Sequence, residues 1–84
     1  MINLHLVLTY YWFDEILAGR KRIEYRELTH YWYLRIHNKR KRIKTVTFSR
    51  GYTKTKLTFD VTKIDIGDCP YDGWDDNYNR IYFK

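Results

Sequence analysis

Cys69 is the only cysteine in this chain of 84 residues, so neither a disulfide nor a multi-cysteine metal site can hold the fold together. A chain this short buries only about 60% of the surface that it exposes when unfolded. Its core therefore has to come from large side chains, and 19% of the residues are aromatic. We expect one domain, spanning residues 1–84, that packs around these aromatics in a reducing compartment.

Neither a membrane span nor an export signal is visible in the sequence. No apolar stretch approaches the ~20 residues that a membrane-spanning helix requires. The first residues, Met1 to Leu4, lack the basic-then-apolar order of a signal peptide. We therefore expect a cytoplasmic protein without a membrane partner.

Basic residues are concentrated in the first two thirds of the chain. The formal net charge is +6, but residues 1–56 hold 13 Lys and Arg against 4 Asp and Glu, and residues 57–84 hold 3 against 6. Such an uneven field attracts polyanions, and phosphate backbones are the commonest of these in a cell. The charge therefore favours nucleic acid as the partner, and solubility alone is the alternative explanation.

The first part of the chain alternates between strand and helix periodicity. Residues 4–8 predict a short buried strand that is rich in Leu and Val. Residues 11–19 place their apolar side chains on one helical stripe, with the acidic residues 14–15 expected in the first turn and Gly19 at the end. Residues 21–26 alternate again, which predicts a strand whose long charged side chains project together.

The rest of the chain predicts one more helix and several strands. Residues 28–36 space their apolar and aromatic side chains at intervals of three and four, as an amphipathic helix does. The other expected elements are an exposed basic loop or edge at 39–42, a strand at 43–48 broken by residues 49–52, a long strand at 57–66 that could curve, an acidic loop at 71–79 anchored by Trp74, and a closing strand at 80–83. This order predicts a small α+β domain, built on a curled sheet or open β-barrel with two short helices.

One motif lies between the two expected helices. An apolar helix is followed by the pattern Gly-x-Lys-x-x-Glu-x-Arg, formed by Gly19, Lys21, Glu24 and Arg26. This segment resembles the signature of the ASCH domain family. The continuation at 26–35, 48–52, 74 and 81–83 is similar to a short phage and bacterial subgroup of that family, so the resemblance covers nearly the whole chain. It implies a PUA-like β-barrel with RNA binding or RNA-linked chemistry in a cleft where the motif lies.

The resemblance also bears on catalysis. Bacterial ASCH amidohydrolases that deacetylate acetylcytidine use a lysine and a threonine nucleophile from this motif, and Glu24 stands where that threonine would be. Only Lys21 carries over, and a carboxylate does not replace a hydroxyl nucleophile, so this activity is not expected. If the chain is nevertheless an RNA-directed hydrolase, either a nuclease or a modified-nucleoside amidohydrolase, Lys21 and Glu24 would serve as acid and base.

The candidate nucleic-acid-binding residues fall in three places. They are Gly19, Arg20, Lys21, Arg22, Glu24 and Arg26 of the motif; Arg50 and Tyr52 of the expected turn; and Lys39, Arg40, Lys41 and Arg42 of the basic run. Lys21 and Arg26 could engage a phosphate or a base carbonyl, while Glu24 accepts from an exocyclic amino group and Tyr52 stacks on a base. The alternative is an ion network that satisfies itself and a basic loop that only adds solubility.

The other tyrosines and the tryptophans could also stack on unpaired bases, but most aromatic residues are expected in the core. Those expected to pack there are Trp12, Phe13, Trp32, Phe48 and Phe59. His5, His30 and His37 show no metal-ligand spacing with one another or with Cys69, so no metal and no cofactor are expected.

Three hypotheses about function follow from the sequence. The leading one is a nucleic-acid or nucleotide-binding module, with single-stranded RNA as the favoured ligand of one basic cleft formed around five residues: Lys21, Glu24 and Arg26 of the motif together with Arg50 and Tyr52. The others are the RNA-directed hydrolase and a protein-interaction module of phage or bacterial origin. A monomer or a weak dimer suits each of them.

Overall fold

Leucines at every second position make the first strand, β1 (Ile2–Leu8), a wall of the core. Leu4, Leu6 and Leu8 are buried, whereas the residues between them are exposed. The strand pairs in parallel with β3 (Ile43–Arg50), in which Val46 and Phe48 are buried in the same alternating way. The alternation of apolar residues in these two strands therefore indicates which face of the sheet lies against the core.

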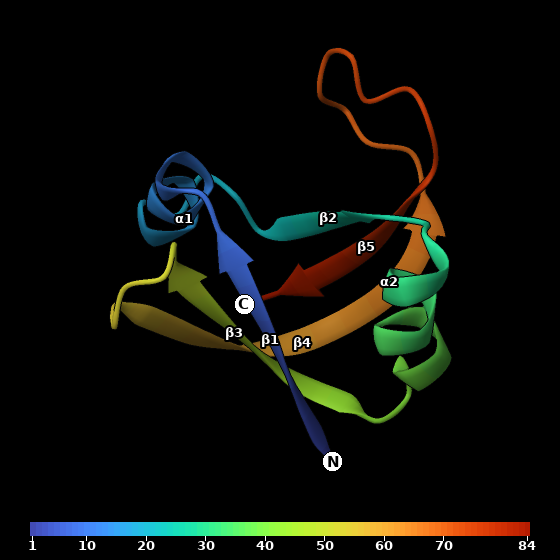
Figure 1. Cartoon of the computed structure of the whole chain (residues 1–84), viewed down its shortest axis with the longest axis horizontal. Coiled ribbons are helices and arrows are strands. Elements are labelled where there is room, and N and C mark those ends of the chain that lie inside the picture. Colours follow the sequence, from blue (N-terminus) through green and yellow to red (C-terminus); the bar gives the residue numbers. More distant parts are fainter.

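The computed structural model describes residues 1–84 and contains five strands and two short α-helices (Figure 1). The other elements are α1 (Tyr10–Leu17), β2 (Ile23–Glu27), α2 (His30–Arg35), a 3-10 turn η1 (His37–Lys39), β4 (Lys56–Gly67) and β5 (Tyr78–Phe83). The strands form one sheet in the order β1-β3-β4-β5-β2, and every pairing except β1–β3 is antiparallel. The expected α+β class with a curled, open-barrel sheet is confirmed.

The long strand β4 gives the sheet its curl. Residues 56–60 of β4 pair with β3, and residues 61–67 pair with β5. The register shifts between Val61 and Lys63, close to the point where the partner changes. Because a bulge of this kind bends a strand and increases its twist, β4 passes from one half of the curled sheet to the other. The expectation that this strand could curve is confirmed.

Helix α1 begins earlier than the sequence predicts. It starts at Tyr10, so Asp14 and Glu15 lie in its second turn, and the expectation that they occupy the first turn is wrong. Both carboxylates form ion pairs instead, Asp14 with Arg50 and Glu15 with Arg20. Gly19 follows the helix with a φ of 82°, a conformation that glycine adopts without strain, and it ends the helix as expected.

Other boundaries also differ from the sequence-based expectation. Strand β2 covers Ile23–Glu27, so the expectation that Lys21 and Arg22 belong to this strand is wrong. Helix α2 covers only residues 30–35, because the Thr29 side chain accepts a hydrogen bond of 3.2 Å from the Trp32 backbone N–H and so caps the helix. Strand β3 continues through Arg50, since parallel pairing with β1 extends to that residue; the expected break at 49–52 begins only at Gly51. Strand β5 begins at Tyr78 rather than at residue 80. Neither helix has the length and apolar character needed to span a membrane.

The core lies inside the curl of the sheet. It joins the buried faces of the strands to Phe13 and Ile16 of α1 and to Ile36 after α2. Three phenylalanines pack at its centre, with ring centroids 5.0 Å apart for Phe48–Phe83 and for Phe59–Phe83. The expectation that aromatic side chains supply the core is confirmed for these residues.

Truncation of one core leucine tests this arrangement. We expect Leu6→Ala to lower the free energy of unfolding by about 2–5 kcal/mol, because Leu6 is 1% exposed and its removal leaves a cavity. Val7→Ala is the matched control, since the neighbouring side chain is 39% exposed and lies on the other face of β1. Chemical denaturation followed by circular dichroism measures both, and equal effects would contradict the assigned faces.

Candidate functional site

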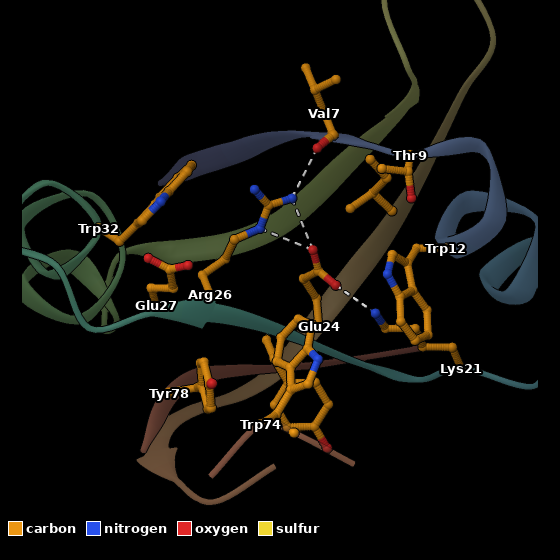
Figure 2. Close-up of a pocket in the computed structure, with 13 residues that line it drawn as sticks. Val7, Thr9, Trp12, Lys21, Glu24, Arg26, Glu27, Trp32, Trp74 and Tyr78 are labelled. Carbon is orange, nitrogen blue, oxygen red and sulfur yellow. Dashed lines mark hydrogen bonds and ion pairs between the residues drawn. The ribbon is translucent and has the colours of Figure 1, made fainter. Parts of the chain in front are cut away.

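A cavity of about 400 Å³ lies where the two edge strands of the curled sheet approach each other (Figure 2). Strands β1 and β2 are these edges, and no backbone ladder joins them. The cavity is lined by Val7, Leu8, Thr9, Trp12, Lys21, Glu24, Tyr25, Arg26, Glu27, Trp32, Gly73, Trp74 and Tyr78. It therefore draws on both edge strands, both helices and the loop before β5.

The Glu24 carboxylate is the centre of an ion network in this cavity. Its Oε1 accepts from Lys21 Nζ at 2.8 Å, and its Oε2 accepts from Arg26 Nε at 3.0 Å. The side chains of Lys21 and Glu24 are 6% and 5% exposed, so the pair is nearly dry. A buried carboxylate with both oxygens engaged is well satisfied, and losing one partner would leave a buried charge uncompensated.

Lys21 also contacts an aromatic wall. Its ammonium lies 4.1 Å from the ring centroid of Trp12 and 5.7 Å from that of Tyr71. The rings of Trp12 and Tyr71 pack at 4.9 Å, which fixes the indole beside the lysine. Cation–π attraction and the ion pair with Glu24 therefore hold Lys21 in one position.

Arg26 bridges the two edge strands. Its Nη2 donates to the Val7 backbone carbonyl at 3.0 Å and lies 2.9 Å from Glu24 Oε2. The guanidinium also lies over the ring of Trp32 at 5.1 Å, and Arg35 lies over that ring at 5.3 Å. Arg26 thus connects β2 to β1 and to α2, and Figure 2 shows it reaching across the gap between the two strands.

The loop before β5 forms the third side of the cavity. Trp74 packs against Tyr71 at 5.8 Å and against Tyr78 at 5.2 Å, which confirms that Trp74 anchors this loop. Burial raises the pKa of Tyr71 to about 12, and the nearby Tyr25 hydroxyl adds to the effect. Burial also raises the pKa of Tyr25. The aromatic side chains of this loop are therefore packed groups rather than freely solvated ones.

The formal charges on the cavity wall cancel. Lys21 and Arg26 are basic, and Glu24 and Glu27 are acidic. Lys21, Glu24 and Arg26 are all paired with one another, but the Glu27 side chain forms no ion pair and no hydrogen bond. The cavity is thus aromatic and electrically balanced, with one carboxylate that has no partner in the protein.

The motif residues separate into two groups. Lys21, Glu24 and Arg26 converge on the cavity, so the expectation that their side chains project together holds for these three, although Lys21 and Glu24 are buried rather than solvated. The other three motif residues, Gly19, Arg20 and Arg22, lie outside it. Arg20 pairs with Glu15 on α1, and the Arg22 guanidinium lies 5.8 Å from the ring of Phe59.

Arg50 and Tyr52 do not share the cavity with the motif, so the single cleft expected around all five side chains is not formed. Arg50 donates two hydrogen bonds to Asp14, of 3.0 and 3.1 Å, and stacks 4.1 Å from the ring of Tyr10. These bonds lower the pKa of Asp14. Arg50 lies near α1 because it pairs with Leu8, the last residue of β1, and α1 follows that strand. Tyr52 lies in the turn after β3 and is 98% exposed.

The basic run at Lys39, Arg40, Lys41 and Arg42 is exposed and occupies the end of η1 and the turn after it, as the expected exposed loop. It lies at the start of β1, because the Ile2 backbone N–H donates to the Arg42 carbonyl. The cavity lies at the other end of β1, at residues 7–9. The run and the cavity are therefore separate surfaces. No group of three or more His, Cys, Asp or Glu side chains forms a metal-binding arrangement.

Sequence reasoning missed the tryptophans and Glu27. Trp12 and Trp32 were expected in the core, and both pack against it, but they are only half-buried and also line the cavity. Trp74 lines it too, so all three tryptophans of the chain lie at the cavity. One signal could have found the first two: each helix that flanks the motif strand carries one tryptophan. No local pattern marks Glu27, because its role depends on what the neighbouring charges bind.

Removing Glu24 tests the ion network. We expect Glu24→Ala to lower the free energy of unfolding by about 3–5 kcal/mol, because Lys21 is then left buried without its counterion. Replacing both residues, as Lys21→Met/Glu24→Leu, should cost less than the two single changes together. Arg20→Ala, which breaks an exposed pair with Glu15, is the control and should have a much smaller effect. A Glu24→Ala effect no larger than the control would contradict the network.

Alkaline titration tests the burial of Tyr71. Its folded-state pKa of about 12 lies above the ordinary value of 10.0, so the unfolded chain loses this proton first. The resulting stabilisation is complete below about pH 10 and is lost as the pH rises toward about 12. Tyr71→Phe should weaken this fall in the free energy of unfolding, as measured by denaturation at several alkaline pH values. Identical pH dependence in both proteins would show that Tyr71 is solvated.

Comparison with known proteins identified no relative of this chain. No protein-family model, curated protein or solved structure matches the chain. The role of the cavity has to be inferred from its own residues.

Proposed function

We propose that this chain is a module that binds single-stranded nucleic acid, preferentially RNA, by taking one unpaired base into the cavity between β1 and β2. The observation that carries the proposal is the convergence of all three tryptophans and the Lys21–Glu24–Arg26 network on that cavity. We further propose that the curled sheet is a PUA-like barrel of the ASCH type. Support comes from the position of Lys21, Glu24 and Arg26, which meet in a cavity as the sequence resemblance implies.

The cavity suits a base better than a larger ligand. Its volume of about 400 Å³ is at the small end of ligand sites, and its aromatic faces match the flat surface of a nucleobase. Stacking on an aromatic side chain contributes about 1–3 kcal/mol per base. A base in a duplex is already stacked and paired, so an unpaired strand supplies the ligand at lower cost.

The phosphate backbone is bound outside the cavity in this proposal. The cavity wall has no net formal charge, so it offers a phosphate little attraction. The exposed run of residues 39–42 is strongly basic, and it directly follows α2, the helix that contributes Trp32 to the cavity. A strand whose base enters the cavity can therefore continue along α2 toward the basic run, where counterion release stabilises binding.

Two double lysine variants test whether the strand follows this path or is attracted only by the net charge of the protein. We expect Lys39→Ala/Lys41→Ala to weaken binding of labelled single-stranded RNA and to reduce the salt slope by about one to two phosphate contacts. Lys54→Ala/Lys56→Ala removes the same charge from exposed positions around the β3–β4 turn and should leave binding nearly unchanged. Trp74→Ala should cost about 1–3 kcal/mol at every salt concentration without changing the slope.

Fluorescence anisotropy across a salt series, with RNA and DNA oligonucleotides, measures all four proteins. Equal effects of the two lysine pairs would mean that the net charge alone attracts the strand. Undetectable binding of both RNA and DNA at low salt would refute the proposed function and would direct attention to protein partners or to hydrolysis.

A further inference from the structure

Glu27 is the one charged side chain of the cavity wall that the protein leaves without a partner. The last residue of β2, it lines the cavity beside Trp32 and next to Arg26 in the chain (Figure 2). Neither of its carboxylate oxygens accepts a hydrogen bond, whereas both oxygens of Glu24 do. The cavity thus contains one buried carboxylate that the protein satisfies, Glu24, and one exposed carboxylate, Glu27, that has no partner within the protein.

A ligand that fills this cavity removes water from Glu27. Covering a carboxylate without replacing its hydrogen bonds is costly, so the ligand must present donors to it. A phosphate or a carbonyl edge would instead place acceptors against a negative charge. A ligand that covers Glu27 is therefore expected to present N–H donors to its carboxylate.

We propose that the cavity selects guanine among the four RNA bases; this inference rests on the proposed function. Guanine carries two neighbouring donors on its Watson–Crick edge, N1–H and the N2 amino group, and these can bind the two oxygens of one carboxylate in parallel. Adenine and cytosine each have one amino group beside a ring nitrogen that accepts, and uracil has one N–H between two carbonyls. Only guanine gives both Glu27 oxygens a donor, and hydrogen bonds to a charged acceptor are strong.

Arg26 offers a hydrogen-bond donor for guanine O6, the acceptor next to N1–H on the guanine edge. Its Nε and Nη2 are occupied by Glu24 and Val7, but its Nη1 donates no hydrogen bond within the protein. Figure 2 shows this third nitrogen on the side away from Glu24. Guanine carries its O6 acceptor next to N1–H, so a free donor from Arg26 beside the free acceptor of Glu27 follows the order of groups on the base.

Trp74 completes the site as a stacking surface. It comes from the loop before β5, and Tyr71 and Tyr78 support its ring. Trp32 is less suited to this role because Arg26 and Arg35 both contact its ring. Arg26, Glu27 and Trp74 all line the cavity, so a purine stacked on Trp74 can present its edge to the two charged side chains.

Tryptophan fluorescence offers a direct measurement, because every tryptophan of the chain lines the cavity. Titration with GMP, IMP, AMP, CMP and UMP should give the tightest binding for GMP. IMP lacks the N2 amino group and should bind on the order of tenfold more weakly, as a lost partner of a bidentate contact predicts. The same titration with Glu27→Gln should weaken GMP binding on the order of tenfold and remove the preference over IMP.

Whether Glu27→Gln strengthens or weakens the binding of GMP distinguishes a specific guanine contact from a general effect of charge. The substitution removes a negative charge, so electrostatic attraction alone would strengthen the binding of every nucleotide, whereas loss of the guanine contact weakens that of GMP. Asp76→Asn removes an exposed acidic charge outside the cavity and measures the electrostatic effect alone. Glutamine keeps the shape of the side chain at an exposed position, and circular dichroism verifies the fold of each variant.

The outcomes distinguish this inference from the proposed function. Equal affinity for all five nucleotides, or a GMP preference that survives Glu27→Gln, would overturn guanine selection while RNA binding still stands. If only oligonucleotides bind detectably, guanine-containing and guanine-free strands replace the nucleotides, and equal affinity for them would overturn it as well. Absence of binding for nucleotides and oligonucleotides alike would reject the proposed function too.

Discussion

The Glu24 carboxylate holds together parts of the chain that the sheet's own hydrogen bonds do not join. An open, curled sheet leaves two unpaired edges, and here these are β1 and β2. Glu24 binds Lys21 ahead of β2 and Arg26 within it, and Arg26 then reaches the Val7 carbonyl on β1. Side chains thus take over the task that a backbone ladder performs in a closed barrel. The gap that they span remains a cavity, so the support of the two sheet edges and the lining of the cavity depend on the same three residues.

Electrostatics divides the molecule into two different surfaces. The cavity wall carries opposite charges that cancel, and five of its lining residues are aromatic. The basic run at residues 39–42 carries four positive charges and no aromatic residue. Contacts to phosphates attract and position a nucleic acid, whereas contacts to base edges discriminate between sequences. The separation of the run from the cavity along β1 is consistent with such a division, in which attraction and discrimination can change independently during evolution.

The sequence predicted the elements better than the assembly of the site. Alternation identified the strands around Leu6, Phe48 and Phe59 because burial on one face of a strand appears directly as a period of two. The motif located Lys21, Glu24 and Arg26 together because they lie close in sequence. Arg50 was misplaced because its position depends on the parallel register between β1 and β3, which no local pattern records. Trp12 and Trp32 were assigned to the core for a similar reason: whether an aromatic residue is fully buried or also lines a cavity depends on which edges of the sheet remain open.

The position of β2 in the sheet has a consequence for how the chain is made. Its only partner is β5, and the two strands are separated by about fifty residues of sequence. During synthesis the motif strand emerges from the ribosome long before the strand that pairs with it, so its buried glutamate and lysine are exposed to water until residues 78–83 appear. The other edge strand, β1, must likewise wait for β3. The cavity between β1 and β2 therefore forms only after residues 78–83 have been synthesised.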